Sequence, residues 1–393
     1  MVVIDIDSHL YEPLNWYEQR FPDLAAKIPP LDPLSLLMTA SFGDLLGCLP
    51  RNMLPTDPLQ RIPRTLRDMY RNADAAQRET LVRSAFERLQ KLPGAHDAHE
   101  RTAWLDAQGI DRQLVLPSIA FPPIARMRRE HPTMAPQLIA AYHTWVLEIL
   151  ADHTERLIPV GVADFETMDR AAVTAELERL RKAGGRSFVM WPMPARGKSL
   201  AHPDFDWIWS LSTDLGMIPM VHGGLGRPAF DEGWFNNGRT YPESVSTYMT
   251  QVHQVPEICL TELLFGGVFQ RHPKLNFFVC EVGIEWVPEW LERIDSMRDF
   301  AARLGGEKWP YPLNPSDYVR RQIRVTPLEH DPTASVIERV GPDIVVFSSD
   351  YPHPEGGQEA KARYRGVLEP KFDGHTLDRF FGASAAELLA VGA

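Results

Sequence analysis

Carboxylates and imidazoles follow several short apolar runs of this sequence, and side chains of these types bind metal ions. The set found at the ends of the runs is Asp7, His9, His222, Glu281 and Asp350. Histidine nitrogens and carboxylate oxygens are common ligands of first-row divalent metals. Acidic groups are rarely fully buried unless they are paired or bind a metal, so apolar runs that end in them point to a functional site.

The spacing in the first run supports a shared target for two of these side chains. Asp7 and His9 are two residues apart, and extended backbone directs both side chains to the same face. Asp5 has the same parity but lies one layer deeper, where a hydrogen bond to a neighbouring strand would explain it. Each of the polar residues alone is typical of a structural role, such as a helix cap or a loop acceptor. Their coincidence at the ends of separate runs predicts a metal site.

The elements that must position these residues are eight buried parallel strands separated by helical patterns. The predicted strands cover residues 2–7, 112–118, 157–164, 186–192, 217–224, 275–283, 322–327 and 344–352. The segment 170–185 spaces its apolar residues at helical intervals and stops at two glycines. Repeated strand–helix units of this number predict an α/β fold, a (β/α)8 TIM barrel, in which catalytic groups gather at the carboxyl ends of the strands.

One connection is too long for a simple crossover between strands. Residues 10–111 separate the first two strands and include a charged helical stretch, 71–92. We interpret the insertion as partly a helical cap over one end of the barrel, within a single domain of residues 1–393. The loop from 223 to about 245 is also long, and loops of that length in a compact domain are more often functional than idle.

The composition excludes several classes of protein. A formal net charge of −11 argues against a general nucleic-acid-binding surface. No apolar run approaches the roughly 20 residues of a membrane-spanning helix, and no signal peptide is visible. The three cysteines are far apart and lack metal-binding or disulfide spacing, which fits a reducing cytoplasm.

Four ordered motifs resemble those of the amidohydrolase superfamily. They are IDIDSHLYEP, VHGG, FGGVFQRHPKLNFFVCEVG and FSSDYPHPEG, and they span most of the chain. The closest part of the superfamily is the amidohydrolase-related branch that contains aminocarboxymuconate semialdehyde decarboxylase and aromatic acid decarboxylases. The resemblance implies a distorted TIM barrel with a bound divalent metal, one or two ions per chain. Zinc, manganese and iron are not distinguished.

The resemblance also implies roles for the strand-end residues. The first-strand motif of the family is usually His-x-His or Glu-x-His, and here it is Asp7 followed by His9. The fifth-strand histidine matches His222 and the last-strand aspartate matches Asp350, so all four are implied metal ligands. Glu281 stands where the family usually has an acid/base histidine.

The glutamate leaves the reaction open. Glu281 could replace the histidine as a general base if burial raises its pKa, or it could be a further metal ligand. In the second case an oxygen-rich set, with or without Glu12 or His353, would suit iron or manganese and could hold two ions.

Three functions follow from these alternatives. The first is hydrolysis or non-oxidative decarboxylation of a small carboxylate-bearing substrate, with Glu281 or Asp350 moving the proton. The second is a dinuclear iron or manganese oxygenase on the same fold that hydroxylates a C–H bond of a small acid. The third is a non-catalytic partner subunit of a related enzyme.

Two residues are candidates for substrate binding. Trp191 follows the fourth predicted strand and could line the pocket, although an aromatic side chain there is often part of the core. Arg227 lies in the loop after His222 and could clamp a substrate carboxylate, although a solvated arginine is an equally good interpretation. We expect a homo-oligomer, a dimer being the commonest, or a complex with a related subunit.

Overall fold

The computed structural model describes residues 1–14, 16–28, 64–226, 246–247, 249–353 and 356–390. Its centre is a seven-stranded sheet in which all strands are parallel and neighbours follow the order of the sequence. The strands are β1 (Ile4–His9), β2 (Arg112–Leu116), β3 (Leu157–Ala163), β4 (Ser187–Met190), β5 (Ile218–His222), β6 (Phe277–Cys280) and β7 (Ile323–Val325). Each lies within or overlaps one of the apolar runs, so the first seven predicted strands are confirmed.

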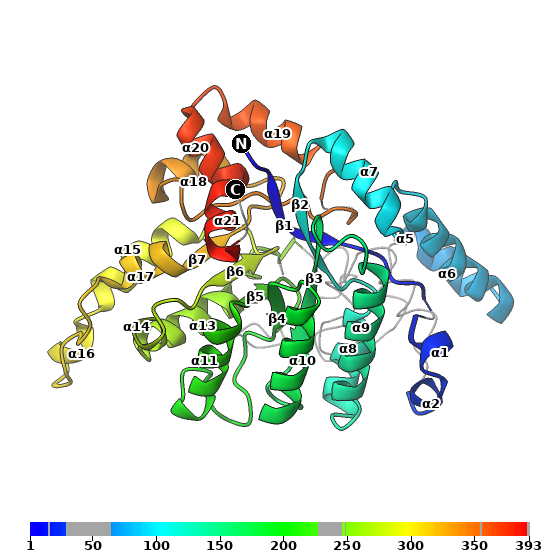
Figure 1. Cartoon of the computed structure of the whole chain (residues 1–393), viewed down its shortest axis with the longest axis horizontal. Helices are drawn as coiled ribbons and strands as arrows, with labels where there is room; N and C mark the ends of the chain where they lie inside the picture. The colour runs from blue at the N-terminus through cyan, green and yellow to red at the C-terminus, as the bar shows by residue number, and fades with distance from the viewer. Residues whose placement is uncertain (15, 29–63, 227–245, 248, 354–355, 391–393) are drawn as a thin grey trace.

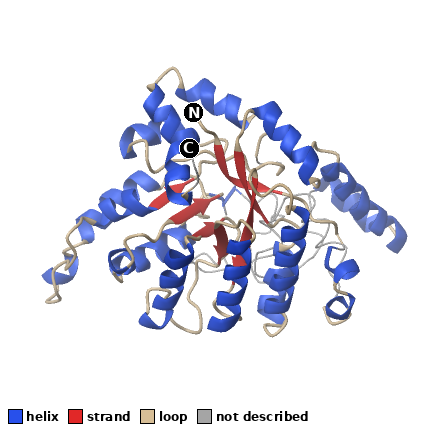
Figure 2. Ribbon diagram, in the orientation of Figure 1, coloured by secondary structure: helices blue, strands red, loops and turns tan. Residues whose placement is uncertain are grey.

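The sheet curls into an open half-barrel with helices around its outer side (Figure 1 and Figure 2). Between β1 and β2 lie α1 (Trp16–Arg20), α2 (Pro22–Ala25), α5 (Arg64–Asn72), α6 (Ala75–Gln90) and α7 (Ala98–Gln108). Between β2 and β6 lie α8 (Phe121–Glu130), α9 (Ala135–Ile149), α10 (Arg170–Lys182), η3 (Pro203–Phe205), α11 (Asp206–Leu215), α13 (Gln254–Phe265) and α14 (Val268–Arg271). After β6 come α15 (Val287–Met297), α16 (Phe300–Arg303), α17 (Pro315–Gln322), α18 (Thr333–Val340), α19 (Ala360–Leu368), α20 (Gly374–Asp378), η5 (Arg379–Ala383) and α21 (Ser384–Leu389).

The helices form where the apolar period and the capping residues agree. In α10, the Asp169 side chain accepts a hydrogen bond from the Ala172 amide and caps the first turn. The same helix buries Val173, Leu177 and Leu180, whose spacing places them on one face. The helix predicted over 170–185 is thus confirmed, although it ends at Lys182, before the two glycines.

The predicted eighth strand is not a regular strand. Residues 344–351 instead make one parallel bridge, between Val325 and Val345, and separate hydrogen bonds to the two edge strands of the sheet, β7 and β1. The Val325 amide donates to the Ile344 carbonyl at 2.8 Å, and the Asp350 amide donates to the Asp7 carbonyl at 2.9 Å. Asp350 has a φ of 52°, in the left-handed region, which interrupts an extended ladder. The segment therefore lies between β7 and β1 without strand geometry.

The charged stretch 71–92 of the long insertion is helical, as predicted, since α6 covers most of it. The helix that fixes the insertion to the sheet is α7. It begins after Asp97, whose side chain accepts from the Glu100 amide, and ends at Gly109 with a φ of 61°. Among the described residues, no helix combines the length and the apolar character needed to cross a membrane.

Candidate metal centre

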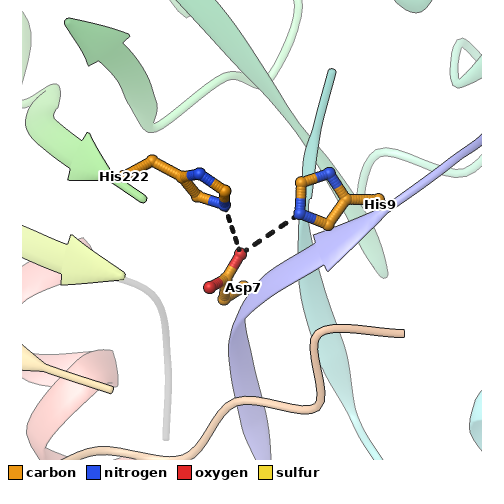
Figure 3. Close-up of side chains that lie close together, drawn as sticks. All are labelled: Asp7, His9 and His222. Atoms are coloured by element: carbon orange, nitrogen blue, oxygen red, sulfur yellow. Dashed lines mark ion pairs between the residues drawn. The ribbon is translucent and has the colours of Figure 1, made fainter. Parts of the chain in front are cut away.

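Three of the predicted ligands converge at the carboxyl ends of the strands (Figure 3). Asp7 and His9 come from β1, and His222 is the last residue of β5. The Oδ1 atom of Asp7 lies 3.5 Å from Nε2 of His9 and 3.4 Å from Nε2 of His222. All three side chains are buried, and one ligand atom from each lies within 4.8 Å of the others. The sheet thus brings together residues more than 200 positions apart in the sequence.

The arrangement fits a divalent metal ion. Oδ1 of Asp7 and Nε2 of His222 are buried and have no hydrogen-bond partner. Buried polar atoms are normally satisfied, so facing atoms that lie just too far apart for a good hydrogen bond need an explanation. Two imidazole nitrogens and a carboxylate oxygen that face one point form a ligand set for first-row metals.

Backbone carbonyls orient both histidines toward that point. Nδ1 of His9 lies 2.9 Å from the Pro117 carbonyl, and Nδ1 of His222 lies 3.0 Å from the Gly223 carbonyl. A carbonyl only accepts, so Nδ1 of each ring carries the hydrogen and donates it. In the neutral rings, the Nε2 lone pairs are then available for a metal, as is usual for metal-binding histidines.

The charges of the cluster are strongly coupled. Burial raises the pKa of Asp7, but the neighbouring His222 and His9 outweigh it and hold the pKa below its ordinary value. Burial, followed by the nearby His353, lowers the pKa of His9 to about 3. Burial also lowers the pKa of His222, but the carboxylates of Glu281 and Asp7 outweigh it and raise the pKa to about 9. In the metal-free protein a proton therefore resides on His222, where a metal ion would replace it.

Glu281 lies behind His222, outside the two clusters of potential ligands among the described residues. It directly follows β6, has a φ of 56°, and its Oε2 atom lies 3.1 Å from Nδ1 of His222. This is the ring nitrogen that faces away from Asp7. A carboxylate in that position orients the imidazole and makes it more basic. The geometry gives Glu281 a direct contact with His222, a predicted ligand.

Asp350 and His353 form a second potential cluster with His9. Oδ1 of Asp350 lies 3.5 Å from Nε2 of His9 and 2.9 Å from Nδ1 of His353. One ligand atom from each of the three lies within 4.8 Å of the others. Asp350, like Glu281, adopts a left-handed backbone conformation, which non-glycine residues seldom adopt and which often marks functional sites.

Glu12 is buried but lies outside both clusters. Its carboxylate accepts from the Ser118 amide at 3.2 Å, in the turn between β2 and α8. Burial raises the pKa of Glu12 to about 7, against the opposing effect of backbone amides that include those of Ser118, Ile119 and Ala120. Its two predicted roles, second metal ligand or substrate contact, stay predictions.

Asp5 has the structural role expected of it, and it reveals a residue that the sequence did not. Asp5 accepts hydrogen bonds from Gln113 of β2 at 2.7 Å and from the Ser349 hydroxyl at 2.5 Å. Gln113 in turn accepts from Arg101 of α7, which also donates to the His9 carbonyl at 2.6 Å. Arg101 is fully buried, yet its sequence context is that of a solvated helix face. No local signal identifies it.

Of the two predicted substrate-binding residues, Trp191 and Arg227, the structure describes Trp191. Trp191 follows β4 and is buried, with the Arg128 guanidinium 5.2 Å above its ring. Arg128 pairs with Asp164 at 2.9 Å, so Trp191 lies beside a charged pair. Arg227 lies outside the described residues.

A small cavity adjoins the centre. Asp7, Glu281 and Asp350 line it, together with the cationic side chain of Arg363 from α19. The Arg363 guanidinium donates to Glu329 at 2.9 Å. Sequence reasoning missed this arginine because it is 10 residues beyond the last strand-end motif residue, His353, on a helix with no distinctive pattern.

Known proteins with related sequences and folds include decarboxylases. A 2-amino-3-carboxymuconate-6-semialdehyde decarboxylase of Dictyostelium discoideum is 24% identical over 63% of this chain. The matched region covers 64% of that relative, so less than two thirds of its length is represented.

Solved structures share the fold over nearly the whole chain. An amidohydrolase from Mycobacterium avium subsp. paratuberculosis superposes with a TM-score of 0.69 and 19% identity over 99% of both chains. A variant of the 5-carboxyvanillate decarboxylase of Novosphingobium aromaticivorans, solved with bound manganese, gives a TM-score of 0.61 at 16% identity. The match covers 99% of this chain and 97% of that one. The amidohydrolase family profile matches residues 4–391, so the strand-end residues described above stand on a chain that belongs to the amidohydrolase family.

Proposed function

We propose that the protein is a metal-dependent enzyme that decarboxylates, without an oxidant, or hydrolyses a small carboxylate-bearing substrate. The observation that carries the proposal is the cluster of Asp7, His9 and His222, whose buried side chains each place one ligand atom within 4.8 Å of the others. The decarboxylases of a carboxymuconate semialdehyde and of carboxyvanillate among the related proteins favour decarboxylation. Both of those names describe small carboxylic acids.

A bound divalent ion would polarise a substrate oxygen or lower the pKa of a bound water. The residues of the chain would do the rest. Asp7, His9 and His222 would hold the ion, and burial would exclude bulk water from the centre. Asp350 lies beside His9 and lines the adjoining cavity, so its carboxyl group is placed to pass a proton to the carbon that loses CO2.

Glu281 would act through His222 in this scheme. Its carboxylate contacts Nδ1 of His222, and both Glu281 and Asp350 line the same cavity. A side chain that only positions His222 would change metal affinity when it is removed, whereas a proton donor would change the rate of the loaded enzyme.

We also propose the finer architecture that such an enzyme requires. Residues 344–351 take the place of an eighth strand and complete a distorted (β/α)8 barrel of residues 1–393. The hydrogen bonds of this segment to both β7 and β1 support it. Residues 10–111 would be partly a helical cap, and the bonds from Arg101 to β1 and β2 support its attachment to the barrel.

The test is product analysis with metal-loaded protein. Purified protein loaded with manganese or zinc is incubated with a panel of hydroxylated aromatic acids and unsaturated dicarboxylic acids. Release of CO2 is followed by mass spectrometry of the headspace, and hydrolysis products by liquid chromatography. We expect turnover that chelation abolishes and that Asp350→Asn lowers by about 100-fold or more. Full metal loading with neither product formed would contradict the proposal.

A second candidate function is a dinuclear iron or manganese oxygenase. The observation that favours it is the second cluster, because His9, Asp350 and His353 also place ligand atoms within 4.8 Å of one another. This function requires two ions per chain and consumption of oxygen. One ion per chain with turnover in the absence of oxygen would exclude it.

A further inference from the structure

The side chains of Ser118, His353 and Asp350 form a continuous hydrogen-bonded chain beside the candidate metal centre. The Ser118 hydroxyl lies 2.9 Å from Nε2 of His353, although the two residues are 235 positions apart. Nδ1 of His353 lies 2.9 Å from Oδ1 of Asp350. Ser118 belongs to the turn between β2 and α8, whereas Asp350 lies in the irregular segment 344–351 between β7 and β1, and His353 follows that segment. Both ring nitrogens of His353 are therefore engaged.

The chemistry of the partners fixes the hydrogen positions. In its ionised form Asp350 only accepts, so Nδ1 of His353 then carries a hydrogen and donates it. In the neutral ring, Nε2 then accepts, and the Ser118 hydroxyl is the donor. The ring of His353 also packs against that of His9, with centroids 3.9 Å apart. Hydrogen bonds at two edges and packing on one face hold the imidazole in place.

Ser118 is itself held by a buried carboxylate. Its backbone amide donates to Glu12 at 3.2 Å, and both residues are at most 1% exposed. This hydrogen bond indicates a structural role for Glu12, which lies in the motif IDIDSHLYEP. The carboxylate fixes the turn that carries Ser118, and the hydroxyl of Ser118 fixes the imidazole.

We infer that Ser118 is a positioning residue that keeps His353 out of metal coordination and directs its Nδ1–H to Asp350. A histidine binds a metal through a free nitrogen lone pair, and the lone pair on Nε2 of His353 points at Ser118. The inference rests on the proposed function and deepens it, because it assigns one metal ion to each chain and leaves Asp350 as the group that His353 orients. The second cluster, formed by His9, Asp350 and His353, then orients the Asp350 carboxylate and binds no second ion.

The same order of serine, histidine and aspartate occurs in nucleophilic hydrolases, but the surroundings of Ser118 do not allow that chemistry. Its side chain is fully buried. The Glu12 carboxylate occupies the neighbouring backbone amides, which an acyl-transfer enzyme would need for an oxyanion. Positioning is the role that this geometry permits.

A tautomer measurement and a double-mutant cycle test the inference. Nitrogen-15 NMR of the histidine-labelled protein, with His353 assigned from the His353→Gln spectrum, should show a neutral ring protonated at Nδ1. Ser118→Ala should shift the Nε2 resonance. Elemental analysis of wild-type protein after saturation with manganese should give one ion per chain, unchanged in Ser118→Ala and His353→Ala.

In kinetics, Ser118→Ala and His353→Ala should each lower kcat by about 10- to 100-fold with little change in KM. The double variant should lose no more than His353→Ala alone, because the serine acts through the histidine. Ser212→Ala is the matched control, since Ser212 is a buried serine whose hydroxyl donates to the Ile208 carbonyl of the same helix, α11. It should keep full metal content and kcat.

Two ions in the wild type with one in His353→Ala would overturn the inference, and so would additive losses of kcat. An Nε2-protonated His353 would overturn it as well. The NMR and metal measurements need no substrate. A failure of the proposed reaction would therefore appear as absent turnover with these results intact, and it would be distinguishable from a failure of the inference. Circular dichroism of each variant confirms that it is folded.

Discussion

Gly223 determines how closely His222 and Glu281 can approach, because any side chain there would collide with the glutamate. A Cβ atom at this position would lie 2.5 Å from the Glu281 carbonyl oxygen and 2.8 Å from Oε2. The backbone oxygen cannot move aside without displacing β6. We expect Gly223→Ala to push Glu281 away from His222 and to weaken metal binding by about 10- to 100-fold. Titration calorimetry with manganese measures the change.

A glycine without such a neighbour provides the control for this substitution. A Cβ atom at Gly366, in α19, would meet nothing within 4 Å. Gly366→Ala should leave metal affinity unchanged and raise stability by about 0.5–1 kcal/mol, since alanine favours the helix. Equal metal affinities in the two alanine variants would show that the approach of Glu281 to His222 has no part in the site.

The proton on His222 predicts a pH dependence of metal binding. The carboxylates of Glu281 and Asp7 raise the pKa of His222 to about 9, so below that pH a metal ion must displace a proton. The pKa of His9 is lowered to about 3, so His9 is neutral throughout the neutral range and adds no further dependence. Affinity for manganese should rise by about tenfold for each pH unit between 6.5 and 8.5.

Calorimetry in two buffers with different ionisation enthalpies provides the proton count for the same experiment. It should give about one proton released per ion bound at pH 7.5. A dissociation constant that stays the same across this range would contradict the assignment of His222 as a protonated ligand.

At the scale of secondary structure, α7 holds β1 in place through one buried arginine. Arg101 donates to the carbonyls of Gly94 and His9 and to the side chain of Gln113, and burial lowers its pKa to about 10, so it remains charged at neutral pH. Arg101→Met would leave these three buried acceptors without their donor. Each such loss costs about 1–3 kcal/mol, so we expect a destabilisation of at least about 3 kcal/mol in urea unfolding.

An exposed arginine gives the comparison. Arg83 of α6 pairs with Glu79 on the surface, and such pairs contribute little. Arg83→Met should change the free energy of unfolding by less than about 0.5 kcal/mol. If Arg101→Met were equally mild, α7 would not be the element that fixes β1.

The strands show where prediction of secondary structure from apolar runs succeeds and where it fails. Seven strands follow from apolar runs because a buried parallel strand needs mostly apolar side chains on both faces, as β3 has. The eighth run is just as apolar, but the left-handed backbone at Asp350 breaks the ladder. Backbone conformation at one residue carries no signature in hydrophobic periodicity.

At the scale of the whole molecule, the sequence predicts candidate metal ligands at the strand ends and leaves the hydrogen-bond partners of these residues unknown. Asp7, His9 and His222 could be predicted because each is a metal-binding type at the end of a predicted strand. Arg101 and Ser118 could not, since the first bonds a carbonyl 92 residues away and the second an imidazole 235 residues away. Such contacts depend on the completed fold. The position of Glu281 behind His222 likewise follows from how β5 and β6 pair.

The metal content of the purified protein, compared with that of Asp7→Asn, tests the central claim most directly. Asn keeps the size of Asp7 but removes the charge that faces both histidines. After saturation with manganese and removal of free ion, elemental analysis should find about one ion per wild-type chain and less than a tenth of that in the variant. Anomalous scattering should place the ion between Asp7, His9 and His222. Equal metal content in the two proteins, or no bound ion in the folded wild type, would contradict the account.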